Sequence, residues 1–391
     1  MAINIISQPE NPNCSKTNLI YNISSSNVNQ PQFQYVMDVY LSSATGSADR
    51  LARIRQFPNP LTQAVFDSAR IFDDNLEYYT DDFTPGISPN NTYSLLTTNQ
   101  MKEFVVKFGE EYGTSPSSSV TLYPDLATGN NIQVWPCQVD PNNGFSFNLS
   151  PGLVPDSSGS ILSDRPTGFN DGEGARRLMA FHNNFAGSSL YVTESYNPGS
   201  TYYHEVQQGV TLVLGTTVGV NSSGTTLSIT FDGNTVERGF FDFCENPIYN
   251  FMFINRYGVW ENFSTDRVTR VNTSVARNNY KQPFVNYSSG GVYNYKRRGE
   301  TNFNTSVTDD YVISTNWLTQ AEANWVSQLI ESDNVYVAID PGDGPTPEPA
   351  ESTFFPVVIT NSSYTKNTGR KDQKIFSYDI NFRFANQRRG R

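Results

Sequence analysis

The sequence predicts a mostly β, multi-domain protein, with β-sandwich modules followed by a C-terminal α+β module in which one helix packs on a small antiparallel sheet. Three observations support this prediction. Aromatic residues form 13% of the 391 residues and all hydrophobic residues only 37%, so a modest number of large rings must fill the cores. Val, Tyr, Phe and Thr favour strands, whereas the frequent Asn, Ser and Thr favour turns over helices. One helix motif, near the C-terminus, can be identified directly.

The first 140 residues contain short segments of strand character, separated by Pro- and Asn-rich turns. The expected strands are Ile3–Ser7, Leu19–Ser24, Phe33–Leu41, Leu51–Phe57 and Glu103–Glu111. The third alternates apolar residues at the period of two that a strand requires. A short helix is expected from Val65 to Tyr78. This spacing is typical of a β-sandwich of the immunoglobulin or fibronectin type III kind with a helical insertion.

The middle of the chain predicts a second β domain with long loops. Asn142 to Asn170 is rich in Gly, Pro, Ser and Asp and is expected to be a loop or linker, and Phe284 to Phe303 is expected to be a second loop. The expected strands are Arg177–Phe181, Ser189–Tyr196, Tyr202–Leu214, Thr225–Phe231, Ile248–Asn255 and Val268–Tyr280.

The helix motif lies in the last eighty or so residues. Thr319 and Glu322 form a capping box, a hydroxyl residue followed three places later by Glu. Behind it, five apolar residues fall on one face at helical spacing: Ala321, Trp325, Val326, Leu329 and Ile330. Strands are expected at Val335–Ile339, Phe354–Thr360 and Ile375–Ala385. The three expected domains are therefore 1–140, 141–308 and 309–391.

The charge distribution argues against nucleic acid as a partner and leaves contacts between neighbouring copies open. A net charge of −11 argues against a nucleic-acid-binding surface over the whole molecule. An acidic run spans Asp73, Asp74, Glu77, Asp81 and Asp82, and a basic segment spans Lys366 to Arg391. Either these are solvated faces, or they attract each other between neighbouring copies.

The cysteines and the apolar runs predict neither bridges nor membrane insertion. Cys14, Cys137 and Cys244 are far apart and odd in number, so free thiols in a reducing cytosol are expected. The first residues lack the basic region and apolar core of a signal peptide. No apolar run approaches the length of a transmembrane helix.

Residues that could carry chemistry are few and scattered. His182 and His204 are the only histidines, and no Gly-x-Ser-x-Gly elbow supports a nucleophilic triad. The paired acids Glu110–Glu111 and Asp309–Asp310 are adjacent in sequence, so in strands their side chains point to opposite faces. The basic clusters Arg176–Arg177 and Lys296–Arg298 could each contact a phosphate, but a surface or subunit contact fits so acidic a chain better. We therefore expect no enzyme, no catalytic or metal-binding residue and no cofactor; a depolymerase with paired acids is the remaining enzymatic alternative.

Tyr- and Asn-rich loops predict contact surfaces. Tyr196–Tyr203 and Tyr280–Tyr295 combine flat rings with hydrogen-bonding side chains. Such surfaces are typical of protein interfaces and would equally suit sugars, on which aromatic rings stack.

Segments along most of the chain resemble one family. In the N-terminal part these are Gln8-Pro9, Ile20-Tyr21, Ser24 to Asn27, Gln30-Pro31, Phe33, Tyr35, Phe57 to Pro60, Phe66-Asp67, Arg70-Ile71 and Phe108 to Tyr112. Further along they are Cys244, Phe253 to Gly258, Asn316 to Thr319, Trp325, Leu329 to Ser332, Val335 to Val337 and Pro356 to Thr360. Together they resemble virion structural proteins of tailed bacteriophages that infect Bacteroidota and related marine bacteria.

The resemblance implies a structural role without an active site. It leads us to expect a subunit of a phage virion, assembled in the host cytoplasm, that forms a homo-oligomeric ring at the tail tip, baseplate or tail-fibre junction and contacts other virion proteins. The alternatives are a virion protein that binds a host receptor or glycan, and a connector or decoration protein of the head. No direct contact with nucleic acid and no membrane insertion are expected.

Overall fold

The structure of the chain, a computed structural model, is mostly β, as predicted. It describes residues 3–9, 13–41, 50–76, 92–97, 102–137, 159–161, 163–169, 171–172, 176–183, 190–197, 201–206, 211–217, 226–238, 240–241, 248–267, 269–281, 285–286, 290, 292–293, 299–340, 355–364 and 375–385. Within these ranges the chain forms strands β1 to β28, in mainly antiparallel sheets, and helices α1 and α2.

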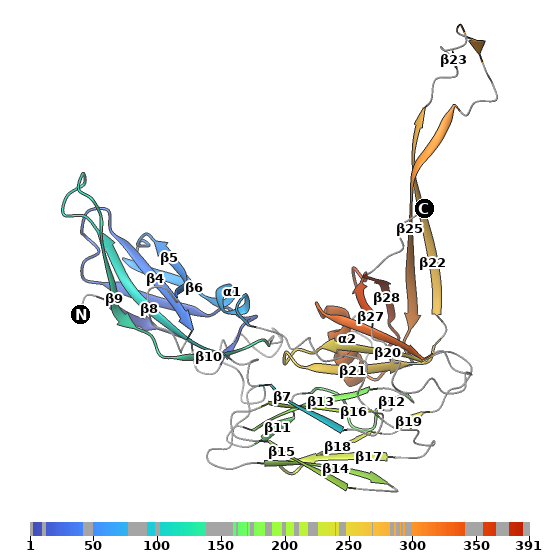
Figure 1. Cartoon of the computed structure of the whole chain (residues 1–391). Helices are drawn as coiled ribbons and strands as arrows, with labels where there is room; N and C mark the ends of the chain where they lie inside the picture. The colour runs from blue at the N-terminus through green and yellow to red at the C-terminus, as the bar shows by residue number, and fades with distance from the viewer. Residues whose placement is uncertain are drawn as a thin grey trace.

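Two sheets form the N-terminal β-sandwich (Figure 1). One sheet pairs β1 (Ile3–Ser7), β3 (Ile20–Ser25) and β6 (Gln63–Asp67). The other has the order β2-β10-β8-β4-β5, with β9 paired to β8. Its strands are β2 (Asn13–Cys14), β4 (Gln34–Leu41), β5 (Arg50–Gln56), β8 (Lys102–Tyr112), β9 (Thr121–Thr128) and β10 (Ile132–Trp135). Rings fill the shared core: the centroids of Tyr21 and Phe108 are 5.5 Å apart, and those of Phe66 and Phe108 are 6.3 Å apart.

The expected helix of the N-terminal domain is shorter than predicted. Residues Val65 to Asp67 belong to β6, and α1 spans only Ala69–Asp73. The register of β6 against β3 explains the difference, because Val65 pairs with Asn22 and Asp67 with Ile20 in the sheet. The residues from 77 to 91 lie outside the described ranges.

A disulfide joins Cys14 to Cys137, which corrects the expectation of free thiols. Parallel pairing of β2 with β10 aligns Cys14 with Trp135 and brings the two cysteine Cα atoms to 4.9 Å, a separation that a disulfide spans. The cysteines are 123 residues apart. A bridge over so long a separation has no local signature, so the cysteine spacing did not reveal it. Cys244 lies outside the described residues.

The middle domain is a second sandwich. Its first sheet has the order β11-β13-β16-β7, with strands β11 (Gly159–Ile161), β13 (Arg176–Asn183), β16 (Thr211–Thr217) and β7 (Thr92–Thr97). Its second sheet has the order β15-β14-β17-β18, with strands β15 (Thr201–Val206), β14 (Leu190–Asn197), β17 (Thr226–Phe231) and β18 (Asn234–Arg238). Two short strands, β12 (Asp171–Gly172) and β19 (Phe240–Phe241), pair separately. The core between the sheets contains Phe181 and Phe231, whose ring centroids are 5.3 Å apart.

Two expectations fail in this domain. The strand expected at Tyr202–Leu214 is two strands, β15 and β16, which belong to different sheets. The strand β7 comes from within the range 1–140 but pairs with β16 of the middle domain. The first expected range therefore contributes to two sandwiches.

A seven-stranded sheet completes the chain, in the order β21-β20-β26-β27-β28-β25-β22. Its strands are β20 (Ile248–Ile254), β21 (Trp260–Thr265), β22 (Thr269–Lys281), β25 (Glu300–Ser314), β26 (Val335–Asp340), β27 (Phe355–Ile359) and β28 (Asp379–Phe384). The expected boundary between residues 308 and 309 falls inside β25. Strands from both sides of it share this one sheet, so the structure does not separate two domains there. Residues 300–303, expected in a loop, also belong to β25. Within the expected loop, which connects β22 to β25 along the chain, two short strands, β23 (Val285–Asn286) and β24 (Val292–Tyr293), pair with each other.

The helix α2 (Gln320–Glu331) packs on this sheet, and its capping box is confirmed. The Thr319 amide donates to Glu322 Oε2 at 2.7 Å, and the Glu322 amide donates to Thr319 Oγ1 at 3.4 Å. The buried face is centred on Val326, with Ala323 and Leu329 three residues to either side. Ala321 is therefore turned away and exposed, contrary to the prediction, and Ile330 is half-buried.

The chain is extended (Figure 1). The N-terminal sandwich lies at one end, and the middle sandwich and the seven-stranded sheet lie together at the other. The strands β22 and β25 leave the edge of that sheet as a long two-stranded arm that projects away from the body.

Candidate interaction surfaces

The arm is formed by β22 (Thr269–Lys281) and β25 (Glu300–Ser314), and it has little cover. The two strands pair over their whole length, from Thr269 opposite Ile313 to Lys281 opposite Glu300, with one irregularity between Asn278 and Asn279. At roughly 3.3 Å per residue the ribbon is about 40 Å long. All residues of β22 after Thr269 are exposed, whichever face they point to. A lone two-stranded hairpin is marginally stable in water, so the part of the ribbon beyond its pairing with β28 would gain stability from a partner.

One face of the arm carries an apolar stripe. Val271 and Val275 are exposed and lie on one face of β22, opposite Tyr311 and Val307 of β25. Tyr311 stacks on the buried Phe382 with ring centroids 5.2 Å apart, so this is the face of the sheet that holds the core. The core-forming face therefore continues along the arm beyond the point where the helix covers it.

A rigid loop after β5 displays two further apolar side chains. Phe57 is 65% exposed and Leu61 is 72% exposed. The Asn59 side chain accepts hydrogen bonds from the amides of Leu61 and Gln63, at 2.9 and 3.0 Å, which closes the turn. Thr62 has a φ of 61°, a left-handed conformation that is strained for a β-branched residue.

The buried Tyr35 holds this loop in place, because its hydroxyl donates to the Thr62 carbonyl at 2.7 Å. Backbone strain of this kind persists only where the surroundings enforce it, and it is frequent at binding sites. Phe57 to Pro60 is one of the segments that carry the family resemblance, and no role was predicted for this loop. Its Pro-Asn-Pro composition was the signal that could have marked a stiff turn.

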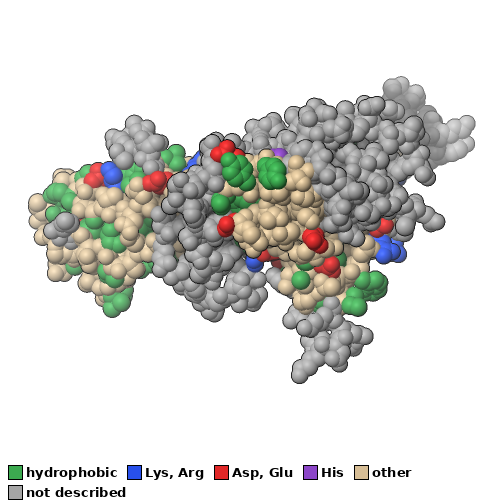
Figure 2. Space-filling view, turned by 90° about the horizontal axis from the view of Figure 1, so that it is seen from below, with side chains coloured by type: hydrophobic (Ala, Val, Ile, Leu, Met, Phe, Trp, Pro, Cys, Tyr) green, Lys and Arg blue, Asp and Glu red, His purple; other side chains and the backbone are tan. Residues whose placement is uncertain are grey.

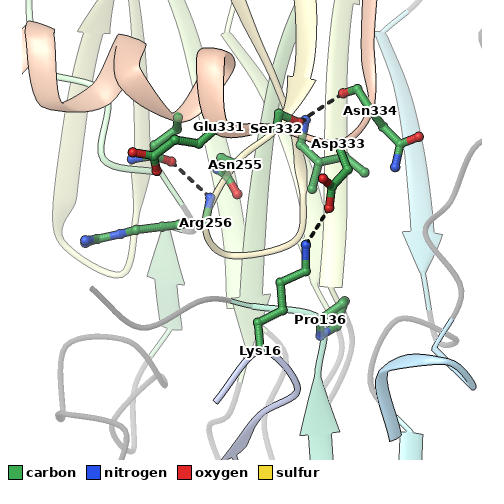
Figure 3. Close-up of a pocket in the computed structure, with 10 residues that line it drawn as sticks. Lys16, Pro136, Asn255, Arg256, Glu331, Ser332, Asp333 and Asn334 are labelled. Carbon is green, nitrogen blue, oxygen red and sulfur yellow. Dashed lines mark hydrogen bonds and ion pairs between the residues drawn. The ribbon is translucent and has the colours of Figure 1, made fainter. Parts of the chain in front are cut away.

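The N-terminal sandwich meets the seven-stranded sheet at a close joint (Figure 3). Gly258, in the turn between β20 and β21, has a φ of 74°, and a Cβ there would lie 2.0 Å from the Pro136 carbonyl oxygen. Pro136 precedes the bridged Cys137. Lys16 Nζ lies 2.9 Å from Asp333 Oδ2, just after the end of α2. The disulfide thus anchors both N-terminal segments that touch the C-terminal sheet.

A network of half-buried polar side chains lies behind this joint. Asp164 accepts hydrogen bonds from Tyr257 Oη and Arg256 Nη2, each at 2.7 Å, and from Gln328 Nε2 at 2.9 Å. Burial, together with the negative charge of Asp164, raises the pKa of Tyr257 to about 12. The network therefore ties a loop of the middle domain to α2 and to the turn that carries Gly258.

A fully buried acid lies beside this network. Glu261 is fully buried, and burial raises the pKa of its carboxyl; hydrogen bonds from Ser163 and Asn255 oppose that increase. The guanidinium of Arg165 lies 5.1 Å from the centre of the Trp325 ring. These groups pair with one another, so the arrangement is that of a polar support under α2.

The paired acids are separated as predicted. Glu110 is buried and accepts hydrogen bonds from Ser25 Oγ at 2.8 Å and Asn27 Nδ2 at 2.9 Å, whereas Glu111 contacts Arg55 Nε at 2.6 Å. In the arm, Asp309 accepts a hydrogen bond from Thr273 Oγ1 at 2.6 Å. The structure therefore pairs Glu110, Glu111 and Asp309 with polar side chains of other residues, and the two members of each pair do not form one site.

The remaining candidates are also dispersed. His204 Nε2 lies 3.3 Å from the buried Glu194, and His182 lies in β13 of the other sheet. In the acidic run, Asp73 accepts a hydrogen bond from Ser15 at 2.5 Å and Asp74 lies 3.9 Å from Arg70.

Other members of the charged segments lie outside the described residues: Glu77, Asp81, Asp82, Lys296–Arg298 and most of Lys366–Arg391. Arg176 and Arg177 lie in β13. The described part of the chain contains no group of three His, Cys, Asp or Glu residues that could hold a metal ion. Within the same ranges, no helix is long and apolar enough to cross a membrane.

Most of Tyr280–Tyr295 lies outside the described residues, but two other tyrosines are displayed. Tyr191 of β14 and Tyr203 of β15 are 56% and 70% exposed. Tyr191 pairs with Glu205, and Tyr203 is two residues from Glu205, so the two rings are diagonal neighbours on one face of the sheet. On the face seen in Figure 2, the described hydrophobic side chains lie in separate small groups rather than in one continuous patch.

Comparison with known proteins leaves the family open. No protein-family model and no curated protein matches the chain. Among solved structures, a chain described as "Biofilm associated protein - BSP domain" is similar with 8% sequence identity and a TM-score of 0.15, over 80% of this chain and 63% of that chain. This chain thus spans less than two thirds of that protein, and at this TM-score the similarity supports no conclusion about fold or function.

Proposed function

We propose that the chain is a structural subunit of a tailed-bacteriophage virion, in a ring at the tail tip, baseplate or tail-fibre junction. The observation that carries the proposal is the arm, a ribbon of about 40 Å whose strand β22 is exposed on both faces after Thr269. Such a ribbon buries little surface in a monomer and so adds little stability, whereas it can extend a subunit to contact its neighbour.

Two further features support an assembly role. The exposed loop with Phe57 and Leu61 is held by Tyr35 and by the Asn59 turn, so it is pre-organised for contact and loses little entropy when it binds. The joint of Lys16, Pro136 and Gly258 fixes the loop-bearing sandwich to the arm-bearing sheet. Two contact elements at opposite ends of one braced chain suit a head-to-tail ring.

The first test is whether the chain is part of the particle. We expect mass spectrometry of gradient-purified virions to detect it at the copy number of a ring, and a map of the intact particle to place it on the tail. A chain that is absent from particles would contradict the proposal, and density on the head would favour the connector or decoration alternative.

The second test uses the arm itself. In a shortened variant, an Asn-Gly turn replaces residues 274–308, which keeps the base of both strands next to β28. We expect this variant to fold and to unfold at an unchanged temperature but to lose self-association in native mass spectrometry. Unchanged self-association would show that the arm is not the assembly element.

A receptor- or glycan-binding virion protein is the second candidate, and Tyr191 and Tyr203 are the observation that favours it. Their exposed rings lie on one face of the sheet, with the exposed Glu205 beside them as a hydrogen-bond acceptor. Aromatic rings with adjacent polar groups are typical of carbohydrate sites. Binding on a glycan array that is lost in Tyr191→Ala and Tyr203→Ala, but kept in Tyr280→Ala of the arm, would support this candidate. An array without hits would oppose it.

A further inference from the structure

The charges of the arm are sorted by strand. Along β22 every charged residue is basic: Arg270, Arg277 and Lys281. Along β25 every charged residue is acidic: Glu300, Asp309 and Asp310. One long side of the ribbon is therefore positive and the other is negative.

Both long sides of the ribbon also present strand edges. β22 is the last strand of the seven-stranded sheet, with β25 as its single neighbour among the described strands. On the other side, β28 pairs with β25 only at Tyr311–Ser314. The pairings of the described residues thus leave β25 between Glu300 and Val307 with β22 as its only strand neighbour. An unprotected strand edge is a template for pairing with another chain.

We propose that the β22 edge of one copy pairs with the β25 edge of the next copy, so that the arms form one continuous antiparallel sheet. The inference rests on the proposed function, because it names the partner of the arm as a second copy of this chain. Two like edges would bring charges of one sign together, whereas β22 against β25 brings opposite charges together. The contact is therefore heterologous, and repetition of it closes a ring or continues a filament.

The geometry of the hairpin fits this contact. Arms that point in the same direction and lie side by side place β25 antiparallel to the neighbouring β22, which is the pairing already present within one arm. The register within the arm sets Lys281 opposite Glu300 and Asp310 opposite Asn272, diagonal to Arg270. Between copies, the neighbouring β22 lies displaced towards the tip of the arm, because β28 already occupies this side of β25 at Tyr311–Ser314. The basic residues of β22 then lie beside the acidic β25 of the other copy. Backbone hydrogen bonds bind the strand, and the charges select the partner edge.

A full exchange of the arm charges tests this pairing without disturbing the arm itself. The variant carries Arg270→Glu, Arg277→Glu and Lys281→Glu together with Glu300→Lys, Asp309→Lys and Asp310→Lys. Its two strands still attract each other, so the arm and its self-assembly are expected to persist. Its β25 is now positive, however, and repels the positive β22 of the wild-type chain.

The readout is native mass spectrometry of the variant mixed with isotope-labelled wild-type chain after dissociation and reassembly. We expect mixed oligomers to fall at least about tenfold below the statistical proportion, a factor that corresponds to 1.4 kcal/mol. The matched control exchanges an exposed pair on α1, Arg70→Asp with Asp74→Arg, and is expected to mix statistically with the wild type. Statistical mixing of the arm variant would overturn the inference, as would a wild-type chain that stays monomeric at all concentrations.

The two proposals fail separately. If the chain is present in purified virions but the arm variant mixes statistically with the wild type, the proposed edge pairing is contradicted and the proposed virion role stands. If the chain is absent from virions but the arm variant and the wild type pair selectively, the proposed virion role is contradicted and the proposed edge pairing stands. If the arm instead binds a different protein, the wild-type chain remains monomeric in vitro, which overturns the pairing with a second copy.

Discussion

The two ends of the seven-stranded sheet differ in burial although both are made of paired antiparallel strands. At one end, every residue of β20 and β21 is buried, under α2 and against the neighbouring domains. At the other end, every residue of β22 after the first is exposed. Backbone pairing alone therefore does not account for the stability of the sheet. The covered end holds the fold together, and the uncovered end is free to be buried by assembly.

The largest expected effect lies at the covered end. Trp325 is fully buried, with the rings of Phe169 and Phe263 at 5.0 and 5.8 Å. Trp325→Ala removes these contacts and leaves a cavity, so it should lower the free energy of unfolding by about 3–5 kcal/mol, measured by denaturant titration. The matched control is Trp317→Ala, because Trp317 is 74% exposed just before the helix; it should change this free energy by less than about 0.5 kcal/mol. Equal effects of the two changes would contradict the assigned packing.

The second effect concerns the brace between the domains. Cys14→Ser with Cys137→Ser removes the bridge that anchors Lys16 and Pro136 at the joint. Loss of a disulfide that closes a loop of this length should cost about 2–4 kcal/mol. Limited proteolysis should then cut faster at the joint, whereas Cys244→Ser, which leaves this bridge intact, should not change the pattern. An unchanged digestion rate in the double variant would contradict the bracing role.

A third test uses pH at the covered end. Burial raises the pKa of Glu261 in the folded chain above its ordinary value of 4.5. Between the pKa of the unfolded chain and the higher pKa of the folded chain, the folded chain therefore holds more protons than the unfolded chain. Glu261 therefore makes the free energy of unfolding fall as pH rises through this window, by at most about 1.4 kcal/mol per pH unit.

Glu261→Gln cannot ionise and should flatten that part of the stability curve, measured by urea titration at successive pH values. Glu205→Gln, at an exposed carboxyl, is the control and should leave the slope unchanged. A slope that persists in Glu261→Gln would show that another group causes it.

The smallest expected effect on folding lies on the arm. Val271→Thr with Val275→Thr keeps strand-forming residues at two exposed positions, so the free energy of unfolding should change by less than about 0.5 kcal/mol. The same change removes the apolar stripe and should weaken self-association in analytical ultracentrifugation. A large loss of stability in the isolated chain would show that the stripe is already covered within the monomer.

Local features of the fold followed from the sequence where a local rule applied. The capping box at Thr319 set the start of α2, and alternation identified the strand at 33–41, whose Phe33, Tyr35, Met37 and Val39 are all buried. That strand also buries Asp38 on its other face, where Arg53 Nε contacts it at 2.6 Å. Alternation within one strand could not show that this second face would be covered, because the arginine comes from the neighbouring strand β5.

The candidate surfaces were less accessible to prediction. Residues 300–303 were expected in a loop because they end a long polar and aromatic segment without clear alternation, yet pairing with β22 extends them into the arm. The charged segments noted in the sequence were the acidic run at residues 73–82 and the basic segment at 366–391, whereas the charges of the arm belong to β22 and β25.

Composition and short-range pattern were enough to establish a β-rich chain, one capped helix and large aromatic cores, because each depends on residues that are neighbours along the chain. Three further features arose only on folding: the Cys14–Cys137 bridge, the sharing of one sheet across the expected boundary, and the exposure of the arm. Each depends on which distant segments lie side by side and on how much cover they provide. Loop closure and packing of the whole chain decide that, and no local period records it.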